Sequence, residues 1–258
     1  MSSRRRFLQQ STTALLTTVS IPAFSAKVSN SEILAAQKLK AALSPEDFAK
    51  EEEFWAMIRE AYTVSATIIN LNNGGVSPQP QHVQEMQYKY IQMSNEAPSH
   101  YMWHILDQGR EPLRQKLAEL AGCLTEEVAI DRNATEALET VIFGLNLKAG
   151  DEVILTKQDY PNMVNAWKQR EQRDGIKLVW LNLELPAEDD NYFVQLFSNA
   201  VTDKTRLVHV THMINWMGQI LPVKKIADSV KKKNAAIEIL SDSAHTFGHF
   251  DYTIPELG

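Results

Sequence analysis

The residues of this chain best suited to chemistry lie together near residue 242. The run Glu238–Leu240 is typical of the end of a strand, and Asp242 and His245 follow it closely. In an open α/β sheet, ligands bind in the crevice beyond the carboxyl ends of the strands. Asp242 and His245 could therefore hold a ligand, although an aspartate after a strand is also a common turn former and a histidine is often structural. Other loops must decide between these interpretations.

A helix start near residue 134 offers a place for a phosphate group. The sequence Asn133-Ala134-Thr135-Glu136 follows a short apolar run and opens a helix with an apolar face. Backbone N–H groups at such a start, together with the Thr135 hydroxyl, can bind an anion. Asn and Thr are also ordinary N-caps, so capping alone explains the same residues.

Two further strand ends carry side chains that could contact a planar ligand. Tyr160 precedes Pro161, so its ring could lie on a heterocycle or merely come before the helix that the proline begins. A long loop over residues 211–222 holds an amide, an indole and a glycine at Asn215, Trp216 and Gly218. Each signal is weak alone, and together they mark successive strand ends.

Paired Asn and Gly residues predict a turn earlier in the chain. The sequence Leu71-Asn72-Asn73-Gly74-Gly75 follows two isoleucines, and its Asn and Gly pairs suit positive φ angles and close backbone approach. A plain turn and a ligand-contacting segment are equally compatible with this loop.

Other kinds of site have less support in the sequence. A metal site is one competing use of the histidines at 209, 212, 245 and 249 with Asp242, but the spacing of the first two does not fit two ligands on one strand face. No His-Glu-x-x-His motif, nucleophile elbow, P-loop or Gly-x-Gly-x-x-Gly motif occurs. We therefore predict no metal, and we keep a metal-dependent hydrolase as an alternative function.

Strands and helices alternate in the part of the chain that must position these residues. Apolar runs predict strands over 128–130, 152–156, 177–183, 206–210 and 236–240, and helices over 162–172, 192–200 and 222–233 separate the last four. This alternation gives right-handed βαβ crossovers. The predicted fold class is α/β, with a mostly parallel sheet covered by helices on both faces.

Helices also precede the sheet. We predict helices over 31–43 and 45–66, which form an N-terminal helical arm over 26–66, and the main domain over 67–258. Further helices are expected over 80–93 and 109–121, the latter with Leu113, Leu117 and Leu120 on one face.

Composition excludes some partners. The 258 residues are 44% hydrophobic, enough for a large core. A net charge of −6 gives no reason to expect nucleic acid or an anionic membrane surface as partner. The single cysteine, Cys123, lies in an apolar setting typical of a buried thiol, and one cysteine allows no disulfide within the chain.

Residues 1–25 have the layout of an export signal. The run Ser3–Leu8 reads Ser-Arg-Arg-Arg-Phe-Leu, and a weakly apolar stretch to Ile21 precedes a small-x-small site at Ala23 and Ser25. This layout resembles a twin-arginine signal peptide. The resemblance implies an exported protein, periplasmic or secreted, that does not contact the membrane after the signal is removed.

Taken in order, the loops resemble the class V aminotransferase family of pyridoxal-phosphate enzymes, particularly its isopenicillin-N-epimerase-like and cysteine-desulfurase-like branch. The motifs that carry the resemblance are Leu71–Gly75, Arg132–Ala137, Asp159–Pro161, Asn215 with Gly218, and Asp242–His249. The resemblance implies pyridoxal 5′-phosphate (PLP) as cofactor, an amino acid or amine as substrate, a partial large domain of fold type I over 67–258, and a homodimer in the intact form. Transamination, epimerisation or carbon–sulfur cleavage is the implied chemistry.

The resemblance also implies a role for each motif residue. Ala134 and Thr135 would hold the cofactor phosphate, and Tyr160 would stack on the pyridine ring. Asp242 would pair with the pyridine nitrogen, and a buried carboxylate suits that role because it keeps the nitrogen protonated. By the same pattern, Asn215 would lie near the ring hydroxyl, and His245 would lie beside it as the catalytic residue. Asn72 and Asn73 would contact the substrate or a neighbouring loop.

One feature of the family pattern is missing. In the family, the Schiff-base lysine follows the Asp-x-x-His motif on a later strand, whereas no lysine follows Lys233 here. We therefore expect the 258-residue chain to be an inactive fragment, because the lysine supplies covalent catalysis and moves the α-proton. A non-catalytic module that binds PLP, or pairs with a subunit supplying the lysine, is the alternative.

Overall fold

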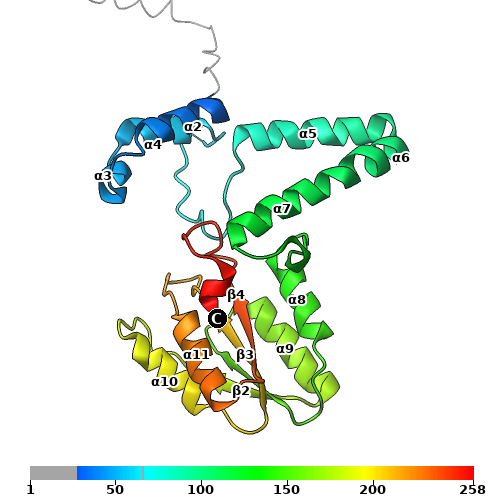
Figure 1. Cartoon of the computed structure of the whole chain (residues 1–258), viewed down its shortest axis with the longest axis vertical. Coiled ribbons are helices and arrows are strands. Elements are labelled where there is room, and N and C mark those ends of the chain that lie inside the picture. Colours follow the sequence, from blue (N-terminus) through cyan, green and yellow to red (C-terminus); the bar gives the residue numbers. More distant parts are fainter. Residues whose placement is uncertain (1–27, 66) are drawn as a thin grey trace, which may run out of the picture. The chain divides into compact units, whose positions relative to one another are not determined.

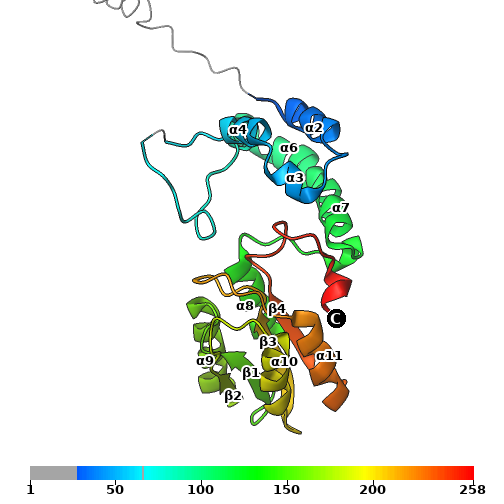
Figure 2. The same cartoon turned by 90° about the vertical axis from the view of Figure 1, so that its left-hand side faces the viewer.

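The structure is a computed structural model that describes residues 28–65 and 67–258, so the predicted signal peptide lies outside the described residues. The chain forms two compact units, Met1–Pro98 and Ser99–Gly258, which are drawn in Figure 1 and Figure 2. The first unit therefore extends beyond the predicted arm over 26–66 and includes the segment up to Pro98. No helix in the described part of the chain is long and apolar enough to span a membrane.

The first unit is helical. Its helices are α2 (Asn30–Leu39), α3 (Pro45–Ala49), α4 (Glu52–Glu60) and α5 (Gln81–Glu96). The prediction of one helix over 45–66 is wrong, because the helix is interrupted between α3 and α4. The break lets Phe48 pack on Phe54 with ring centroids 4.7 Å apart, and the indole Nε1 of Trp55 donates to the Ala49 carbonyl oxygen at 3.0 Å.

The second unit begins with several short helices and two longer ones. In order they are α6 (Pro98–Tyr101), η1 (Met102–Leu106), η2 (Asp107–Gly109), α7 (Arg110–Ala121), η3 (Thr125–Glu127) and α8 (Ala134–Gly144). Helix α7 buries its small side chains, Ala118 and Ala121, while Leu113 and Leu120 are exposed. The predicted apolar face of this helix is therefore not the face that packs within the unit.

The predicted strand over 128–130 is wrong. Arg114 of α7 reaches across to this segment, where its Nε donates to the Val128 carbonyl oxygen at 2.9 Å. Its Nη2 donates to the Thr125 carbonyl oxygen at 2.6 Å. A side chain thus takes the backbone acceptors that a neighbouring strand would otherwise use.

A four-stranded parallel sheet forms the centre of the second unit. Its strands are β1 (Glu152–Thr156), β2 (Lys177–Leu181), β3 (Thr205–Thr211) and β4 (Glu238–Asp242), in the order β2-β1-β3-β4. The connecting helices are α9 (Pro161–Asp174), α10 (Asp190–Asn199) and α11 (Val223–Lys233), and a last turn, η4, covers Ile254–Leu257. The predicted α/β fold is confirmed, and these four strands lie close to their predicted bounds.

Helices cover both faces of this sheet, with α8 and α9 on one side and α10 and α11 on the other (Figure 1). Neighbouring residues of β1 point to opposite cores: Ile154 packs with Phe193 and Ile226, whereas Val153 packs with Ile142 and Trp167. Burial on both faces explains why the strands are apolar runs without alternation.

The strand order fixes where a ligand can bind. The chain passes from β1 outward to β2, then returns across β1 to add β3 and β4 on the other side. The connections therefore diverge between β1 and β3, so the crevice that binds ligands in open α/β sheets is expected beyond the carboxyl ends of these two strands. The loops after β1, β3 and β4 leave the sheet at this edge.

A buried arginine fastens α8 to α9. The side chain of Arg170 on α9 is almost fully buried, its guanidinium donates to the carbonyl oxygens of Ile142 and Leu145 at the end of α8, and its Nε lies against the Asp174 carboxylate. Ile142 lies in the last turn of α8, where carbonyl oxygens have no partner within the helix, and Leu145 is the C-cap residue.

Replacing Arg170 by Met should therefore destabilise the second unit. The change removes the donor to two carbonyl oxygens, and we expect the free energy of unfolding to fall by about 2–4 kcal/mol. Arg173→Met is the matched control, because Arg173 also pairs with Asp174 but is exposed, and it should cost less than about 1 kcal/mol. Urea unfolding followed by tryptophan fluorescence measures both, and equal losses would contradict the anchoring role.

Candidate active site

Asp242 ends β4 at the carboxyl edge of the sheet. Its side chain is only 8% exposed, and its Oδ1 accepts a hydrogen bond from the Ala244 backbone N–H at 3.1 Å. No described residue hydrogen-bonds its other carboxylate oxygen. His245 is half-buried in the turn that follows, and its carbonyl oxygen accepts from the Nδ1 of His249 at 3.0 Å. The predicted acid and imidazole thus share one turn.

A second buried carboxylate lies between β1 and β3. Oδ1 of Asp159 accepts from the hydroxyls of Thr156 at 2.7 Å and Thr211 at 2.8 Å. Its Oδ2 accepts from the Thr156 backbone N–H at 2.8 Å. Because these threonines end neighbouring strands, Asp159 fixes the start of the crevice and the position of the next residue, Tyr160.

The N-terminus of α8 is open to an anion. Asn133 is the N-cap, and its Oδ1 accepts from the Glu136 backbone N–H at 3.0 Å. The backbone N–H groups of Ala134 and Thr135 have no hydrogen-bond partner among the described residues, and Ala134 is exposed. The Thr135 hydroxyl accepts from Nδ2 of Asn162 at 3.4 Å, which joins the starts of α8 and α9.

Tyr160 and Asn215 lie on the two intervening loops. Tyr160 is the N-cap residue of α9 and is 42% exposed. Asn215 is exposed on the loop after β3, and this loop is closed by a bridge between Met213 and Ile220. Tyr160 can therefore present its ring, and Asn215 its amide, to a ligand.

Contacts between the loops connect the predicted cofactor residues along one edge. The starts of α8 and α9 join through Asn162, the ends of β1 and β3 join through Asp159, and the His212 backbone N–H donates to the Asp242 carbonyl oxygen at 2.9 Å. The structure thus brings together the segments that carry the following residues: Ala134, Thr135, Tyr160, Asn215, Asp242 and His245.

Asn72 and Asn73 belong to the first unit, where they form a turn. Asn70 organises this turn: its Nδ2 donates to Oδ1 of Asn73 at 2.6 Å, and its Oδ1 accepts from the Asn72 backbone N–H at 2.9 Å. A Cβ at Gly75 would come within 2.9 Å of Oδ1 of Asn72, so a larger residue there would have to displace the Asn72 amide. The expected positive φ angles at Gly74 and Gly75 are wrong.

His212 is a site residue that sequence reasoning considered only as a metal ligand. Its side chain is 8% exposed, and its Nδ1 lies 3.0 Å from the Thr246 hydroxyl and 3.3 Å from the Ser243 hydroxyl. Thr246 and Ser243 belong to the turn that carries Asp242 and His245. The one available signal was the position of His212 directly after a strand, next to the Asn215 loop.

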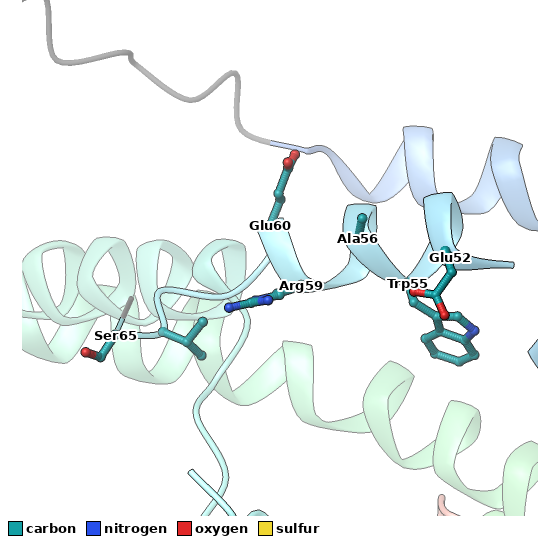
Figure 3. Close-up of a pocket in the computed structure, with 7 residues that line it drawn as sticks. Glu52, Trp55, Ala56, Arg59, Glu60 and Ser65 are labelled. Carbon is teal, nitrogen blue, oxygen red and sulfur yellow. The ribbon is translucent and has the colours of Figure 1, made fainter. Parts of the chain in front are cut away.

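Two cavities lie within the described part of the first unit. One of about 560 Å³ is lined by α4 and the loop after it, with Glu52, Trp55 and Arg59 on the helix and Ser65 on the loop (Figure 3). A larger one of about 920 Å³ includes Asn73 in its lining. Within residues 28–65 and 67–258, no three His, Cys, Asp or Glu side chains form a group that could hold a metal ion.

Comparison with known families decides what this edge belongs to. The family described as aminotransferase class-V matches residues 69–258, which is most of the chain and includes every loop described above. The chain belongs to the class V aminotransferase family. The match begins close to the predicted domain start at residue 67.

Curated relatives in this family have two kinds of name. A probable cysteine desulfurase of Synechocystis sp. is 28% identical over 191 residues, which cover 71% of this chain and 44% of that protein. An isopenicillin N epimerase of Streptomyces clavuligerus is 25% identical over 204 residues, which cover 79% of this chain and 51% of that protein. The chain thus spans about half the length of the curated relatives it matches.

Solved structures of the family share the fold. The cystine C-S lyase C-DES, in complex with its reaction product cysteine persulfide, has a TM-score of 0.66 and 25% identity, over 74% of this chain and 51% of that chain. A mutant of C-DES with glycine covalently linked to its PLP cofactor has a TM-score of 0.69 and 24% identity, over 77% of this chain and 52% of that chain. These neighbours confirm the predicted fold type I.

Pyridoxal 5′-phosphate is the cofactor of this class V family, and the residues of the edge fit it. A phosphate fits the free N–H groups at the start of α8. A protonated pyridine nitrogen fits the buried Asp242 carboxylate, which has one oxygen without a hydrogen-bond partner among the described residues. A planar ring fits the exposed face of Tyr160.

Burial of His212 should make stability depend on pH. Desolvation lowers the pKa of His212 below its ordinary value of 6.5. The unfolded chain then binds a proton at His212 more readily than the folded chain does. The stability that the neutral imidazole contributes is therefore fully present above about pH 6.5 and is lost as the pH falls towards the folded pKa.

Urea unfolding of wild type and His212→Asn between about pH 7.5 and 5.5 tests this expectation. Wild type should lose more stability than the variant as the pH falls. His249→Asn, at an exposed histidine of the same unit, is the matched control for a histidine change. If the stability of His212→Asn fell with pH as much as that of wild type, the prediction would be wrong.

Proposed function

We propose that this chain is the cofactor-binding part of a PLP-dependent enzyme that acts on an amino acid or amine, by transamination, epimerisation or carbon–sulfur cleavage. The observation that carries the proposal is the buried carboxylate of Asp242, which lies at the same sheet edge as the open N-terminus of α8. The relatives named cysteine desulfurase and isopenicillin N epimerase support this range of reactions.

Each edge residue has a proposed task. Ala134 and Thr135 hold the phosphate through backbone N–H groups and a hydroxyl, and Tyr160 covers one face of the ring. Asp242 keeps the pyridine nitrogen protonated. The bound cofactor supplies an electron sink for the substrate carbon next to the amino group. Asp242 sets the strength of that sink because its negative charge stabilises the protonated ring.

Asn215 and His245 complete the proposed site. Both follow strands that border the crevice, and we propose that they hydrogen-bond the ring hydroxyl. The proposed catalytic group is the imidazole of His245, which can hold or release a proton close to neutral pH. Asn72 keeps its proposed contact with the substrate or a neighbouring loop. Asn73 keeps the same proposed contact, and its amide is also hydrogen-bonded to Asn70 within the turn.

The Schiff-base lysine is not among these residues. No lysine follows Lys233 in the sequence, so this polypeptide by itself should bind PLP without a covalent bond and should not turn over a substrate.

Exposed apolar side chains support a homodimer as the intact form. Leu113 and Leu120 on α7, with Leu124 after it, are each about half exposed or more. Val141 on α8 is also exposed. We propose that a second subunit covers these side chains in the dimer.

Binding of PLP to the purified chain tests the proposal. Asp242→Asn should weaken binding about 10- to 100-fold, because it replaces a charge-assisted hydrogen bond with a neutral one. Equilibrium dialysis measures the affinity. Borohydride reduction followed by mass spectrometry should find no cofactor fixed to the chain at a single lysine.

Asp228→Asn is the matched control, because Asp228 is an exposed aspartate on α11 and its loss should leave PLP affinity as in wild type. A wild-type chain that does not bind PLP would overturn the proposed function. Equal affinity of wild type and Asp242→Asn would instead overturn only the role given to Asp242.

We further propose export by the twin-arginine route, with a periplasmic or secreted mature protein. The pattern Ser-Arg-Arg-x-Phe-Leu assigns Arg4 and Arg5 as the arginine pair and Arg6 as the variable position. Replacing both Arg4 and Arg5 by Lys should abolish export, whereas Arg6→Lys should not. Cell fractionation with an antibody to the chain measures the exported share, and equal export of both variants would refute the route.

A further inference from the structure

We propose that His212 is a positioning residue, which holds the turn carrying Asp242 and His245 in place through hydrogen bonds to the hydroxyls of that turn. The proposal deepens the proposed function, on which its consequence for PLP rests. His212 itself contacts neither reacting atoms nor cofactor in this role. It acts through Asp242 and His245.

Backbone and side-chain hydrogen bonds connect His212 to both neighbouring loops. Its backbone N–H donates to the Asp242 carbonyl oxygen at 2.9 Å, and its carbonyl oxygen accepts from the Leu221 backbone N–H at 2.8 Å. Its Nδ1 lies 3.0 Å from the Thr246 hydroxyl and 3.3 Å from that of Ser243. The Leu221 bond closes the loop that carries Asn215, so one residue fastens both loops.

The partners of His212 are themselves fixed. Thr246 is fully buried, and its hydroxyl lies 2.9 Å from the Tyr252 hydroxyl and donates to the Ser243 carbonyl oxygen at 3.2 Å. The Tyr252 ring meets the imidazole edge to face, with centroids 5.2 Å apart. These side chains can therefore hold the turn in place without taking part in the chemistry.

The buried imidazole and hydroxyl groups of this cluster suit a constant structural role. Because the Thr246 hydroxyl donates its one proton to the Ser243 carbonyl oxygen, it accepts from His212, and this bond requires the tautomer that carries the proton on Nδ1. Burial of His212 and Thr246 makes a lost bond costly, because neither group can turn to water. A carboxylate that must meet a ring nitrogen needs this kind of support, since small displacements weaken a charge-assisted hydrogen bond.

Two changes at His212 separate hydrogen bonding from packing. His212→Asn keeps a polar atom near the position of Nδ1, whereas His212→Phe keeps a ring against Tyr252 but loses the bond. We expect His212→Phe and Thr246→Val to weaken PLP binding about fivefold or more, and His212→Asn to remain within about twofold of wild type. Amide hydrogen exchange at Ala244 and Thr246 should speed up by a similar factor in the first two variants.

Thr205→Val is the matched control for Thr246→Val. Thr205 is also fully buried and its hydroxyl also accepts a hydrogen bond, from the Thr202 backbone N–H at 2.9 Å, but it lies at the opposite end of β3. Its loss should leave PLP affinity and exchange in the turn as in wild type. Tyr252→Phe, which removes one hydroxyl from the cluster, is the milder variant if His212→Phe does not fold, and it should speed exchange at Thr246.

The outcomes separate this proposal from the proposed function. A wild-type chain that fails to bind PLP would end the proposed function, while exchange in the turn would still decide the role of His212. Unchanged exchange in His212→Phe and Thr246→Val would overturn the positioning role. Loss of affinity in His212→Asn but not in His212→Phe would also overturn it, because ring packing would then be the cause. Equal effects in Thr205→Val would show general destabilisation instead.

Discussion

Parallel pairing of β1, β3 and β4 is the constraint on which the rest of the structure depends. Because Thr211 of β3 lies beside Asp242 of β4 in the parallel register, the two strands end together and their loops leave at one edge. A shift by one residue would turn Asp242 to the other face of the sheet and exchange the two cores. The same register that packs the half-buried Ile239 and Leu240 against the two cores therefore places a carboxylate where a ligand can reach it.

Buried polar residues at this edge do two different jobs. The Asp159 carboxylate accepts hydrogen bonds from two hydroxyls and a backbone N–H. It therefore joins two strands and has little hydrogen-bonding capacity left for a ligand. Asp242 accepts one short-range bond and keeps capacity for a partner. Since a buried carboxylate without enough partners is costly, the difference between these two aspartates distinguishes the structural acid from the ligand-binding one.

The sequence was sufficient for the sheet but not for the polar contacts within it. Runs such as Val153–Leu155 are apolar on both faces and are bounded by turns, so their strands followed from local pattern. The segment after η3 was apolar too, yet Arg114 takes its carbonyl oxygen, and no local pattern shows a donor from fourteen residues away. The bond between Asp159 and Thr211 and the bond between His212 and Thr246 likewise join residues far apart in sequence, which only the folded sheet brings together.

The Asp242 carboxylate is held in place by the residues around it and not by its own hydrogen bond alone. An aspartate at the end of an edge strand would ordinarily follow the motion of its turn, because β4 has a described neighbour on one side only. Bonds from His212 at the backbone and the side chain fix that turn to β3, a strand held on both sides. The polar cluster beneath the turn thus gives an edge strand the rigidity of a central one, and a carboxylate that must set the protonation of a ring requires that rigidity.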